Sequence, residues 1–404
     1  MAIIVQKFGG TSVGSLERIE AVAEQIIQTK NRGHQVVAVL SAMSGETNRL
    51  LDLAHQIDAK PSPRELDMLL ASGEQVSISL LAIALIKRGY SAVSLLANQI
   101  GLRTNNRFNK ARIKYIDNTR MLTELQQGHV VIVAGFQGCD DEGNITTLGR
   151  GGSDTSAVAI AASLQAKECQ IFTDVDGVYT TDPRIEAQAK KLEQVSFDEM
   201  LEMASSGAKV LHSRSVEFAG AHQMPLRVLS SFNSGTGTKI TFNEANLTNN
   251  PVTAIASQKD EAMFTLLGIK DFKLLHKELF LALAEADIEV DMLQQSVVNH
   301  SSNDLSFTLH RNDYSSASEI ISQLIRSNLI EDYIGDSELV KLSLIGRGIR
   351  ANTSINRLLF DCLHENNVEL FLMSSSEIKI SFLVKPHVHD SLVKALHKKF
   401  KLEQ

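Results

Sequence analysis

Two glycine-rich turns are the first candidates for chemistry, because each lies between a strand-like run and a helix-like run. The first, residues 9–12 (Gly-Gly-Thr-Ser), directly follows Lys7 and the apolar run 3–8. The second is residues 149–154 (Gly-Arg-Gly-Gly-Ser-Asp). Backbone N–H groups and the dipole at a helix start bind phosphate and other anions. One such turn is common without a ligand, whereas two in one domain favour an anion site.

Charged side chains accompany these turns. The guanidinium of Arg150 suits a carboxylate or a phosphate. Asp154 is either part of the site or a helix cap, which is a common role for Asp. Lys209, in the segment 207–212 (Gly-Ala-Lys-Val-Leu-His), is most simply a solvated lysine when taken alone.

A third segment, residues 173–184, follows the strand-like run 170–173 and is rich in Asp, Gly and Pro. That density is explained by turn formation alone. However, ligands of open α/β sheets bind at the carboxyl ends of the strands, which is where this segment lies. The chain has neither a G-x4-G-K-[ST] phosphate loop nor the His-Arg-Asp loop of protein kinases.

The elements that position these segments alternate between strand and helix. Expected strands are 3–8, 35–40, 92–96, 130–134 and 170–173, and expected helices are 16–27, 66–86, 117–127 and 155–164. This alternation predicts an α/β domain, residues 1–242, with a mostly parallel central sheet. A polar linker is expected over 243–262. An internal repeat then predicts two ferredoxin-like α+β copies, 263–335 and 336–404.

Composition narrows the classes of function. The net charge is -7 and the pI about 6.0, which disfavours nucleic acid as a partner. No apolar run approaching 18 residues and no signal peptide are recognised, so a soluble cytoplasmic protein is expected. The three cysteines do not match zinc spacing. Of 24 glycines, 20 lie in residues 1–240, so the first domain is the one expected to bring backbone close to a ligand.

Together the segments 7–12, 149–154, 173–177 and 207–212 closely resemble the signatures of aspartate kinases in the amino acid kinase family. Residues 41–48 (Ser-Ala-Met-Ser-Gly-Glu-Thr-Asn) and 71–74 (Ala-Ser-Gly-Glu) fit the same family. The resemblance covers the whole chain, since aspartate kinases carry two C-terminal ACT domains where the repeat lies. It implies a three-layer α/β kinase domain followed by two ACT domains, which pair chains into a homo-oligomer.

The resemblance also implies an activity and a set of roles. Aspartate kinases transfer the γ-phosphoryl group of ATP to the β-carboxylate of L-aspartate. Lys7, Asp154 and Lys209 would be catalytic. ATP would be bound by Lys7, Gly9, Gly10, Thr173, Asp174, Tyr179, Arg184 and Lys209. Aspartate would be bound by Ser41, Thr47, Glu74, Arg150 and Ser153, with Arg150 on a carboxylate and Glu74 on the amino group. Mg2+ would be carried by the phosphates, and no metal ligand is assigned.

Several alternatives stay open. Within the fold these are UMP, glutamate and N-acetylglutamate kinases; outside it, a non-catalytic amino-acid sensor with a relic kinase domain. The resemblance places effector residues at Asp291, Gln295, Ser375 and Glu377. However, the turns 270–273 and 350–353 lack the Pro-Gly pair usual in ACT domains. This departure predicts altered or absent feedback by lysine or threonine, with Phe272 occluding the pocket.

Met263 has two interpretations. It either begins a separate regulatory product, as in some relatives, or is a core methionine.

Overall fold

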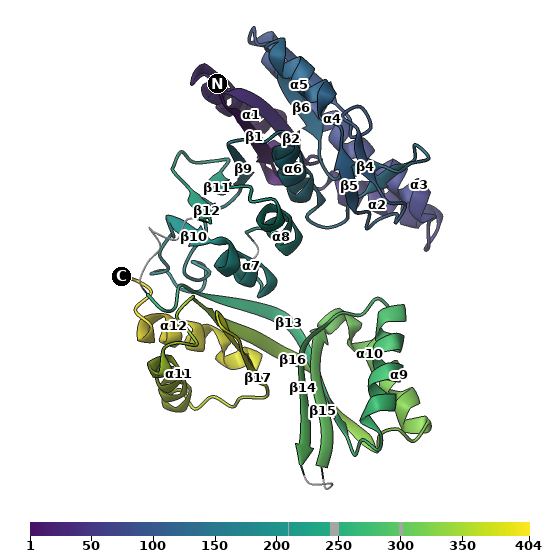
Figure 1. Ribbon diagram of the computed structural model, residues 1–404, viewed down its shortest axis with the longest axis vertical. Coiled ribbons are helices and arrows are strands. Elements are labelled where there is room, and N and C mark those ends of the chain that lie inside the picture. Colours follow the sequence, from purple (N-terminus) through teal and green to yellow (C-terminus); the bar gives the residue numbers. More distant parts are fainter. Residues whose placement is uncertain (209, 243–249, 299–301) are drawn as a thin grey trace. The chain divides into compact units, whose positions relative to one another are not determined.

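The computed structural model describes residues 1–208, 210–242, 250–298 and 302–404 (Figure 1). They form two compact units, each described by itself. The N-terminal unit holds Met1–Tyr179, Lys191–Ser205 and the described residues from 210 to 242. The C-terminal unit holds Thr180–Lys190, Ser206–Ala208 and the described residues from 250 onward.

The N-terminal unit is built on an eight-stranded sheet of order β10-β12-β11-β9-β1-β2-β6-β3. All neighbours are parallel except β11 and β12. The strands are β1 (Ile3–Phe8), β2 (Gln35–Leu40), β3 (Ala92–Leu95), β6 (Val130–Ala134), β9 (Glu168–Thr173), β10 (Gln194–Ser196), β11 (Leu226–Ser230) and β12 (Thr238–Thr241). Continuous apolar runs such as β2 and β6 are typical of strands buried on both faces.

Helices accompany the strands of the N-terminal unit. The helices are α1 (Leu16–Asn31), α2 (Glu46–Ile57), α3 (Pro63–Leu70), α4 (Ser72–Lys87), α5 (Thr119–Gln126), α6 (Gly152–Ser163), α7 (Phe197–Ser205) and α8 (Ser213–Ala221). Helices α1 and α4 share one buried core with β1, β2 and β6. Helix α6 packs on β1 and α8. Ser15 caps α1 through the N–H of Arg18, as its sequence position predicts.

One predicted helix is two. The stretch expected as 66–86 breaks at Ala71 into α3 and α4. Among the described residues, Pro63–Lys87 is the one helical stretch long and apolar enough to cross a membrane. Of its most apolar window, 56% is buried inside the protein, and a core helix passes the same test of length and composition.

A second sheet of the N-terminal unit is absent from the sequence prediction. It has four short strands in the order β5-β4-β7-β8: β4 (Leu102–Thr104), β5 (Ile113–Ile116), β7 (Gln137–Cys139) and β8 (Ile145–Thr147). Strand β7 begins three residues after β6 ends, and α3 packs on β8. This small sheet therefore extends from the β6 side of the main sheet.

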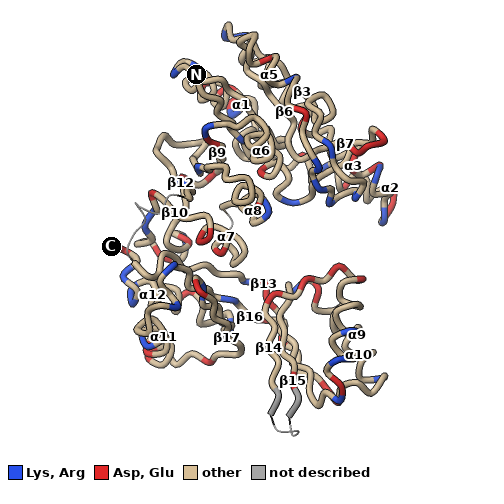
Figure 2. The backbone as a smooth tube through the Cα atoms, viewed as in Figure 1, with Lys and Arg blue, Asp and Glu red and all other residues tan. Residues whose placement is uncertain are grey.

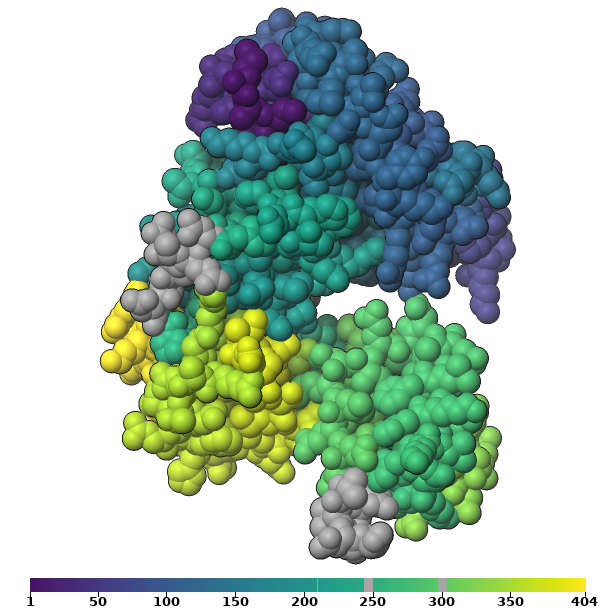
Figure 3. All heavy atoms as spheres, in the orientation of Figure 1, coloured from purple at the N-terminus to yellow at the C-terminus, as the bar shows by residue number. Residues whose placement is uncertain are grey.

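The C-terminal unit has one antiparallel sheet of order β14-β15-β13-β16-β18-β17. Its strands are β13 (Ala254–Leu267), β14 (Val290–Val298), β15 (Ser302–His310), β16 (Asp332–Ile345), β17 (Met373–Ser375) and β18 (Lys379–Val384). Its helices are α9 (Phe272–Glu285), α10 (Tyr314–Arg326), α11 (Thr353–Glu365) and α12 (His389–Lys399). Each copy of the repeat buries its own core, and the two form separate lobes (Figure 3).

The two copies share strands, which corrects the predicted boundaries. Residues 254–262, expected in a linker, form the first part of β13, and the expected boundary 335/336 falls inside β16. Ala254–Gln258 pairs with the second half of β16, whereas the segment 263–267 pairs with its first half. The register shifts between them, at the polar residues around Asp260. Those polar residues made a strand look like a linker.

The segment Thr180–Lys190 packs with the C-terminal unit, although the sequence analysis includes it in residues 1–242. The hydroxyl of Thr180 lies 2.9 Å from Nε2 of buried His397, and the N–H of Ile255 donates to the carbonyl of Thr180 at 2.7 Å. Ile185 packs against the core of the second copy. The N-terminal unit is therefore not one continuous stretch of chain.

Candidate active site

The first glycine turn lies at the carboxyl end of β1. Gly10–Val13 forms a 3-10 turn, and α1 begins after it. The N–H of Gly9 donates to the carbonyl of Phe172 at 3.3 Å, so this predicted phosphate donor is already used by β9. A Cβ on Gly10 would lie 3.1 Å from the carbonyl oxygen of Ala42. A larger residue at Gly10 would therefore be tight where the β1 and β2 loops approach each other.

Lys7 and Asp154 meet across the first and second glycine turns. Nζ of Lys7 lies 2.5 Å from Oδ1 of Asp154, and Lys7 is 9% exposed. Lys7 is positioned by β1, between β2 and β9, and Asp154 by the first turn of α6. Asp154 therefore pairs with the ammonium group at the end of the sheet instead of capping its helix, where no side-chain cap hydrogen bond forms.

The loop carrying Arg150 is shaped by two left-handed glycines, Gly149 (φ +75°) and Gly151 (φ +69°). A Cβ on Gly149 would lie 2.8 Å from the carbonyl oxygen of Asn109, and one on Gly151 2.3 Å from the ring of His212. Side chains at either position would be strained by φ and by contact. Arg150 between them is exposed.

Glu74 is a buried carboxylate at the start of α4. It is 3% exposed, and Oε1 accepts the N–H of Ala42 at 3.0 Å. Oε2 has no hydrogen-bond partner among the described residues. Burial raises the pKa of Glu74 to about 8. A cationic group that approached it would stabilise the charged form and lower that pKa.

The other residues expected to bind the acceptor lie at neighbouring strand ends. Ser41 follows β2, and its N–H donates to the carbonyl of Phe8 at 3.1 Å. Thr47 is in the first turn of α2, after the left-handed Gly45. Ser153 is in the first turn of α6, and a Cβ on Gly135, just after β6, would lie 3.0 Å from it. Ser41 and Thr47 therefore lie in the segment after β2. Ser153 lies in the second glycine turn, close to the residue that follows β6.

The segment after β9 carries the residues expected to bind nucleotide. The hydroxyl of Thr173 donates to Asp174 at 3.1 Å, and the hydroxyl of Tyr179 donates to Asp176 at 2.8 Å. Strand β9 lies on the other side of β1 from β2. The expected nucleotide and acceptor residues thus follow different strands on the two sides of Lys7.

Two expected site residues are not placed with the others. Arg184 pairs in bidentate geometry with Asp182, its side chain is 85% exposed, and it belongs to the segment that packs with the C-terminal unit. Lys209 lies outside the described residues. Their roles stay predictions.

Asp67 in α3 is a residue that the sequence analysis missed. Its fully buried carboxylate accepts the N–H of Asn109 at 3.0 Å and the N–H and hydroxyl of Thr147 at 2.8 and 2.6 Å. Burial raises its pKa, while these hydrogen bonds lower it. Asp67 therefore connects the loop containing Asn109 to Thr147, and both lie close to Gly149. No local signal marked it, because α3 also contains the charged residues Arg64 and Glu65.

The expected effector residues are separated in the chain. Asp291 and Gln295 lie on β14, and Ser375 ends β17, at the opposite edge of the same sheet. Glu377 pairs with Arg350 at 2.9 Å, and both are exposed. One chain therefore does not bring the four residues together.

Asp291 already has a cationic partner, Lys341 from β16. Nζ of Lys341 also lies 3.6 Å from Oε1 of Glu261, and both of these residues are buried. Burial raises the pKa of Glu261 to about 7, although Lys341 opposes the shift. The carboxylate expected to bind an effector is thus neutralised by the protein itself.

The two turns without Pro-Gly are closed by side-chain caps. Asp271 accepts the N–H groups of Lys273 and Leu274 at the start of α9, and Asn352 accepts the N–H of Ser354 at the start of α11. Phe272 is half-buried and packs against the core of the first copy. Its proposed occlusion of an effector pocket stays a prediction.

Comparison with known proteins places this geometry in a family. A family described as "Amino acid kinase family" matches residues 2–230, more than half of the chain, and one described as "ACT domain" matches residues 342–400. The chain is 50% identical over 404 residues to an aspartate kinase of Pseudomonas putida, covering 100% of this chain and 98% of that protein. It is 49% identical over 405 residues to an aspartokinase of Pseudomonas aeruginosa, with the same coverage.

A solved structure agrees. The crystal structure of E. coli aspartokinase III in complex with aspartate and ADP is 28% identical, with a TM-score of 0.83, covering 98% of this chain and 99% of that one. The chain belongs to the amino acid kinase family and, within it, to the aspartate kinases. The resemblance, the fold class and the assignment as a phosphotransferase are therefore confirmed.

Proposed function

We propose that this protein transfers the γ-phosphoryl group of ATP to the β-carboxylate of L-aspartate, giving 4-phospho-L-aspartate. The observation that carries the proposal is the contact of 2.5 Å between Lys7 and Asp154, which joins two glycine turns at the end of β1. Phosphoryl transfer needs positioned cations more than covalent chemistry. A lysine held in place by a carboxylate at a strand end supplies such a cation.

No general base is required by this reaction, because a carboxylate acceptor is already ionised at pH 7. The role of the chain is to position two anions and to neutralise their charge. Lys7, with Lys209, would bind the β- and γ-phosphates, and Asp154 would orient Lys7. Thr173, Asp174, Tyr179 and Arg184 would line the nucleotide site. The Gly10 N–H would add a donor.

The acceptor would bind on the β2 side of Lys7. Arg150 would pair with a carboxylate of L-aspartate, and Glu74 would accept its ammonium group. Ser41, Thr47 and Ser153 would complete the site with hydroxyls. The buried Oε2 of Glu74, which lacks a partner among the described residues, supports an ammonium ligand, because a buried acceptor without a partner is costly.

Magnesium would enter with the nucleotide. Within the described part of the chain, no three His, Cys, Asp or Glu side chains gather as a metal site. The one carboxylate of a described residue that contacts Lys7, that of Asp154, is paired with its ammonium group, so no metal ligand is assigned there. When bound, the ion would neutralise phosphate charge.

The wider setting follows from the same assignment. The product would be the first intermediate towards lysine, threonine and methionine, made in the cytoplasm. The ACT-like copies would pair chains into a homo-oligomer. Feedback by lysine or threonine would be weak or absent, because Asp291 is already paired with Lys341. Inhibition by millimolar lysine or threonine, at the potency usual for feedback, would contradict this last part.

A phosphoryl-transfer assay tests the proposal. The full-length protein is incubated with MgATP and L-aspartate, L-glutamate, N-acetyl-L-glutamate or UMP in parallel, and ADP is measured together with acyl phosphate, or with UDP in the UMP reaction. We expect matched ADP and acyl phosphate with L-aspartate only. Matched products with another acceptor would move the chain to a different kinase, and no turnover with any acceptor would favour the non-catalytic sensor.

A further inference from the structure

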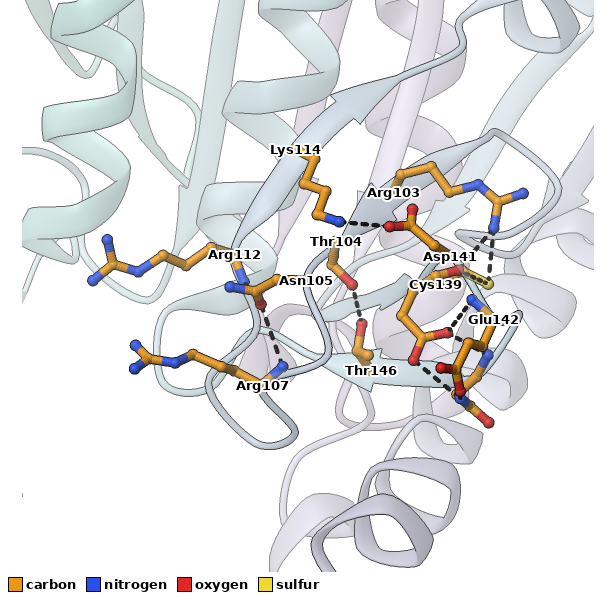
Figure 4. Close-up of polar contacts among 12 residues, drawn as sticks. Arg103, Thr104, Asn105, Arg107, Arg112, Lys114, Cys139, Asp141, Glu142 and Thr146 are labelled. Atoms are coloured by element: carbon orange, nitrogen blue, oxygen red, sulfur yellow. Dashed lines mark hydrogen bonds and ion pairs between the residues drawn. The ribbon is translucent and has the colours of Figure 1, made fainter.

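The loop between β4 and β5, residues 105–112, carries two arginines that no function above uses. We call it the arginine loop. Arg107 and Arg112 are exposed, and their guanidinium groups have no partner among the described residues. In Figure 4 they extend side by side, away from the small sheet.

The other cations of the same hairpin, Arg103, Lys110 and Lys114, each have an interaction partner, so the exposed pair is distinct. Arg103 donates to the carbonyl of Asp140 at 3.0 Å, and Lys114 donates to Asp141 at 2.6 Å (Figure 4). Figure 2 shows these basic and acidic segments side by side around β7. Arg107 and Arg112 remain as cations facing solvent.

The backbone of the loop holds the two arginines together. Oδ1 of Asn105 accepts the N–H of Arg107 at 3.4 Å and that of Arg112 at 2.9 Å. The N–H of Asn105 donates to the carbonyl of Arg112 at 3.0 Å. One asparagine therefore closes the loop at its base and places both arginines at its neck.

The arginine loop is fastened beside the acceptor loop. The N–H of Ala111 donates to the carbonyl of Thr147 at 2.9 Å, and Asp67 binds Asn109 and Thr147 at once. The carbonyl of Asn109 lies so close to Gly149 that a Cβ there would approach to 2.8 Å. Gly149 immediately precedes Arg150, so the paired arginines belong to a loop that contacts the proposed acceptor site.

The strand order points to the acceptor rather than the nucleotide. The small sheet continues from β6, which pairs with β2, and the expected acceptor residue Ser41 follows β2. The expected nucleotide residues follow β9, on the far side of β1. An anion bound at the arginine loop is therefore on the acceptor half of the sheet.

We infer that Arg107 and Arg112 form a capture site for the carboxylates of the acidic amino-acid acceptor. This inference rests on the proposed function. L-Aspartate is a net anion at neutral pH, and the chain, with its net charge of -7, would otherwise repel it. Planar guanidinium groups match carboxylates, and two of them on an exposed loop attract the acceptor before it reaches Arg150.

The test is the double variant Arg107→Gln/Arg112→Gln, compared with Lys87→Gln/Arg120→Gln. The control removes the same two charges from α4 and α5, where both side chains are exposed and in ion pairs. We expect the KM for L-aspartate of the first variant to rise roughly tenfold at low ionic strength, with kcat unchanged. The difference should shrink at 0.5 M salt, because screening removes long-range attraction. The control should behave as the unaltered protein.

Three outcomes would overturn the inference: no change in the KM for L-aspartate, the same change in the control, or a rise in the KM for MgATP instead. Calorimetric titration with L-aspartate alone keeps the test independent of turnover. Equal affinity of the unaltered protein and the arginine variant would also overturn it. If the unaltered protein binds L-aspartate but transfers no phosphoryl group, the proposed function fails while the capture site is still tested.

Discussion

Two buried lysines, one in each unit, contact carboxylates, yet their positions in the two sheets differ. Lys7 is the second-last residue of β1, 2.5 Å from Asp154 and 9% exposed. Lys341 is in the interior of β16, 2% exposed, between Asp291 and Glu261. Both are charge pairs of low exposure, and neither pairing alone tells which one meets a ligand.

The difference lies in what surrounds each ammonium group. Around Lys7 the strands end and glycine turns begin, so the backbone and the ammonium face a common edge. Lys341 has paired strands on both sides, β13 and β18, and neutralises two carboxylates of the protein itself. We propose that the place of a charge pair relative to the strand ends, rather than its burial, separates the proposed ligand site at Lys7 from the structural pair at Lys341.

The largest expected effect is the loss of Lys7. Lys7→Ala should lower kcat roughly thousand-fold, because a preorganised cation at the transferring phosphoryl group is removed. Steady-state kinetics with MgATP and L-aspartate measure it, and circular dichroism checks the fold. Lys7→Ala/Asp154→Asn should lose little more than the single variant, because the pair acts as a unit. Near-normal turnover in Lys7→Ala would refute its role.

Lys341→Met should instead affect stability, by about 1–2 kcal/mol more at pH 8 than at pH 5.5, because at pH 8 the buried Glu261 carboxylate must either lose its cation or take up a proton. The smaller loss at pH 5.5 has a simple cause. Glu261, whose pKa burial raises from 4.5 to about 7, is then mostly protonated and needs no partner. Calorimetric melting of the full chain at both pH values measures this. Equal losses at the two pH values would contradict the structural role of Lys341.

Glu74→Gln separates binding from stability within the N-terminal unit. The pKa of Glu74 is raised from 4.5 to about 8, so its ionisation in the folded state is unfavourable. The unaltered protein should therefore lose stability as pH rises from about 4.5 to 8 and level off above. Glu74→Gln should lack this slope, while its KM for L-aspartate rises at least tenfold, about 1.4 kcal/mol. If the unaltered protein and Glu74→Gln lose stability in parallel as pH rises, the pH dependence does not come from ionisation of the buried Glu74.

The smallest effects compare the two helix caps of the repeat. Asp271→Ala and Asn352→Ala should each cost about 1 kcal/mol, because each removes a side-chain acceptor at a helix start. Denaturant melts followed separately in the two lobes, by hydrogen exchange, assign each loss to its own copy. A cap variant that changed both lobes equally would show that the copies unfold as one body.

The main sheet was predictable because its strands are continuous apolar runs. Ile3–Phe8, Gln35–Leu40 and Val130–Ala134 begin and end where the sequence predicts. The small sheet was not, because strands of three or four residues such as Leu102–Thr104 carry too few positions to show a period. Its position depends on Asp67, whose hydrogen bonds join residues far apart in the chain.

The sequence could indicate which residues belong to the candidate site, but not which of them contact each other. The glycine turns indicated where Lys7, Asp154 and Arg150 belong, because glycine marks close backbone approach. No local pattern revealed that the N–H of Gly9 is taken by Phe172, or that Lys341 reaches Asp291 from another strand. Such pairings depend on the register between distant strands, which one sequence does not display.

The shared strand β13 limits where a separately translated C-terminal product could begin. A separately translated product starting at Met263 would lack Ala254–Gln258, the residues that pair with Lys341–Ile345 of β16. That half of β16 would keep a neighbour on one side only and present an unpaired edge, which promotes aggregation. An independently folding regulatory product would therefore need its start codon upstream of Ala254.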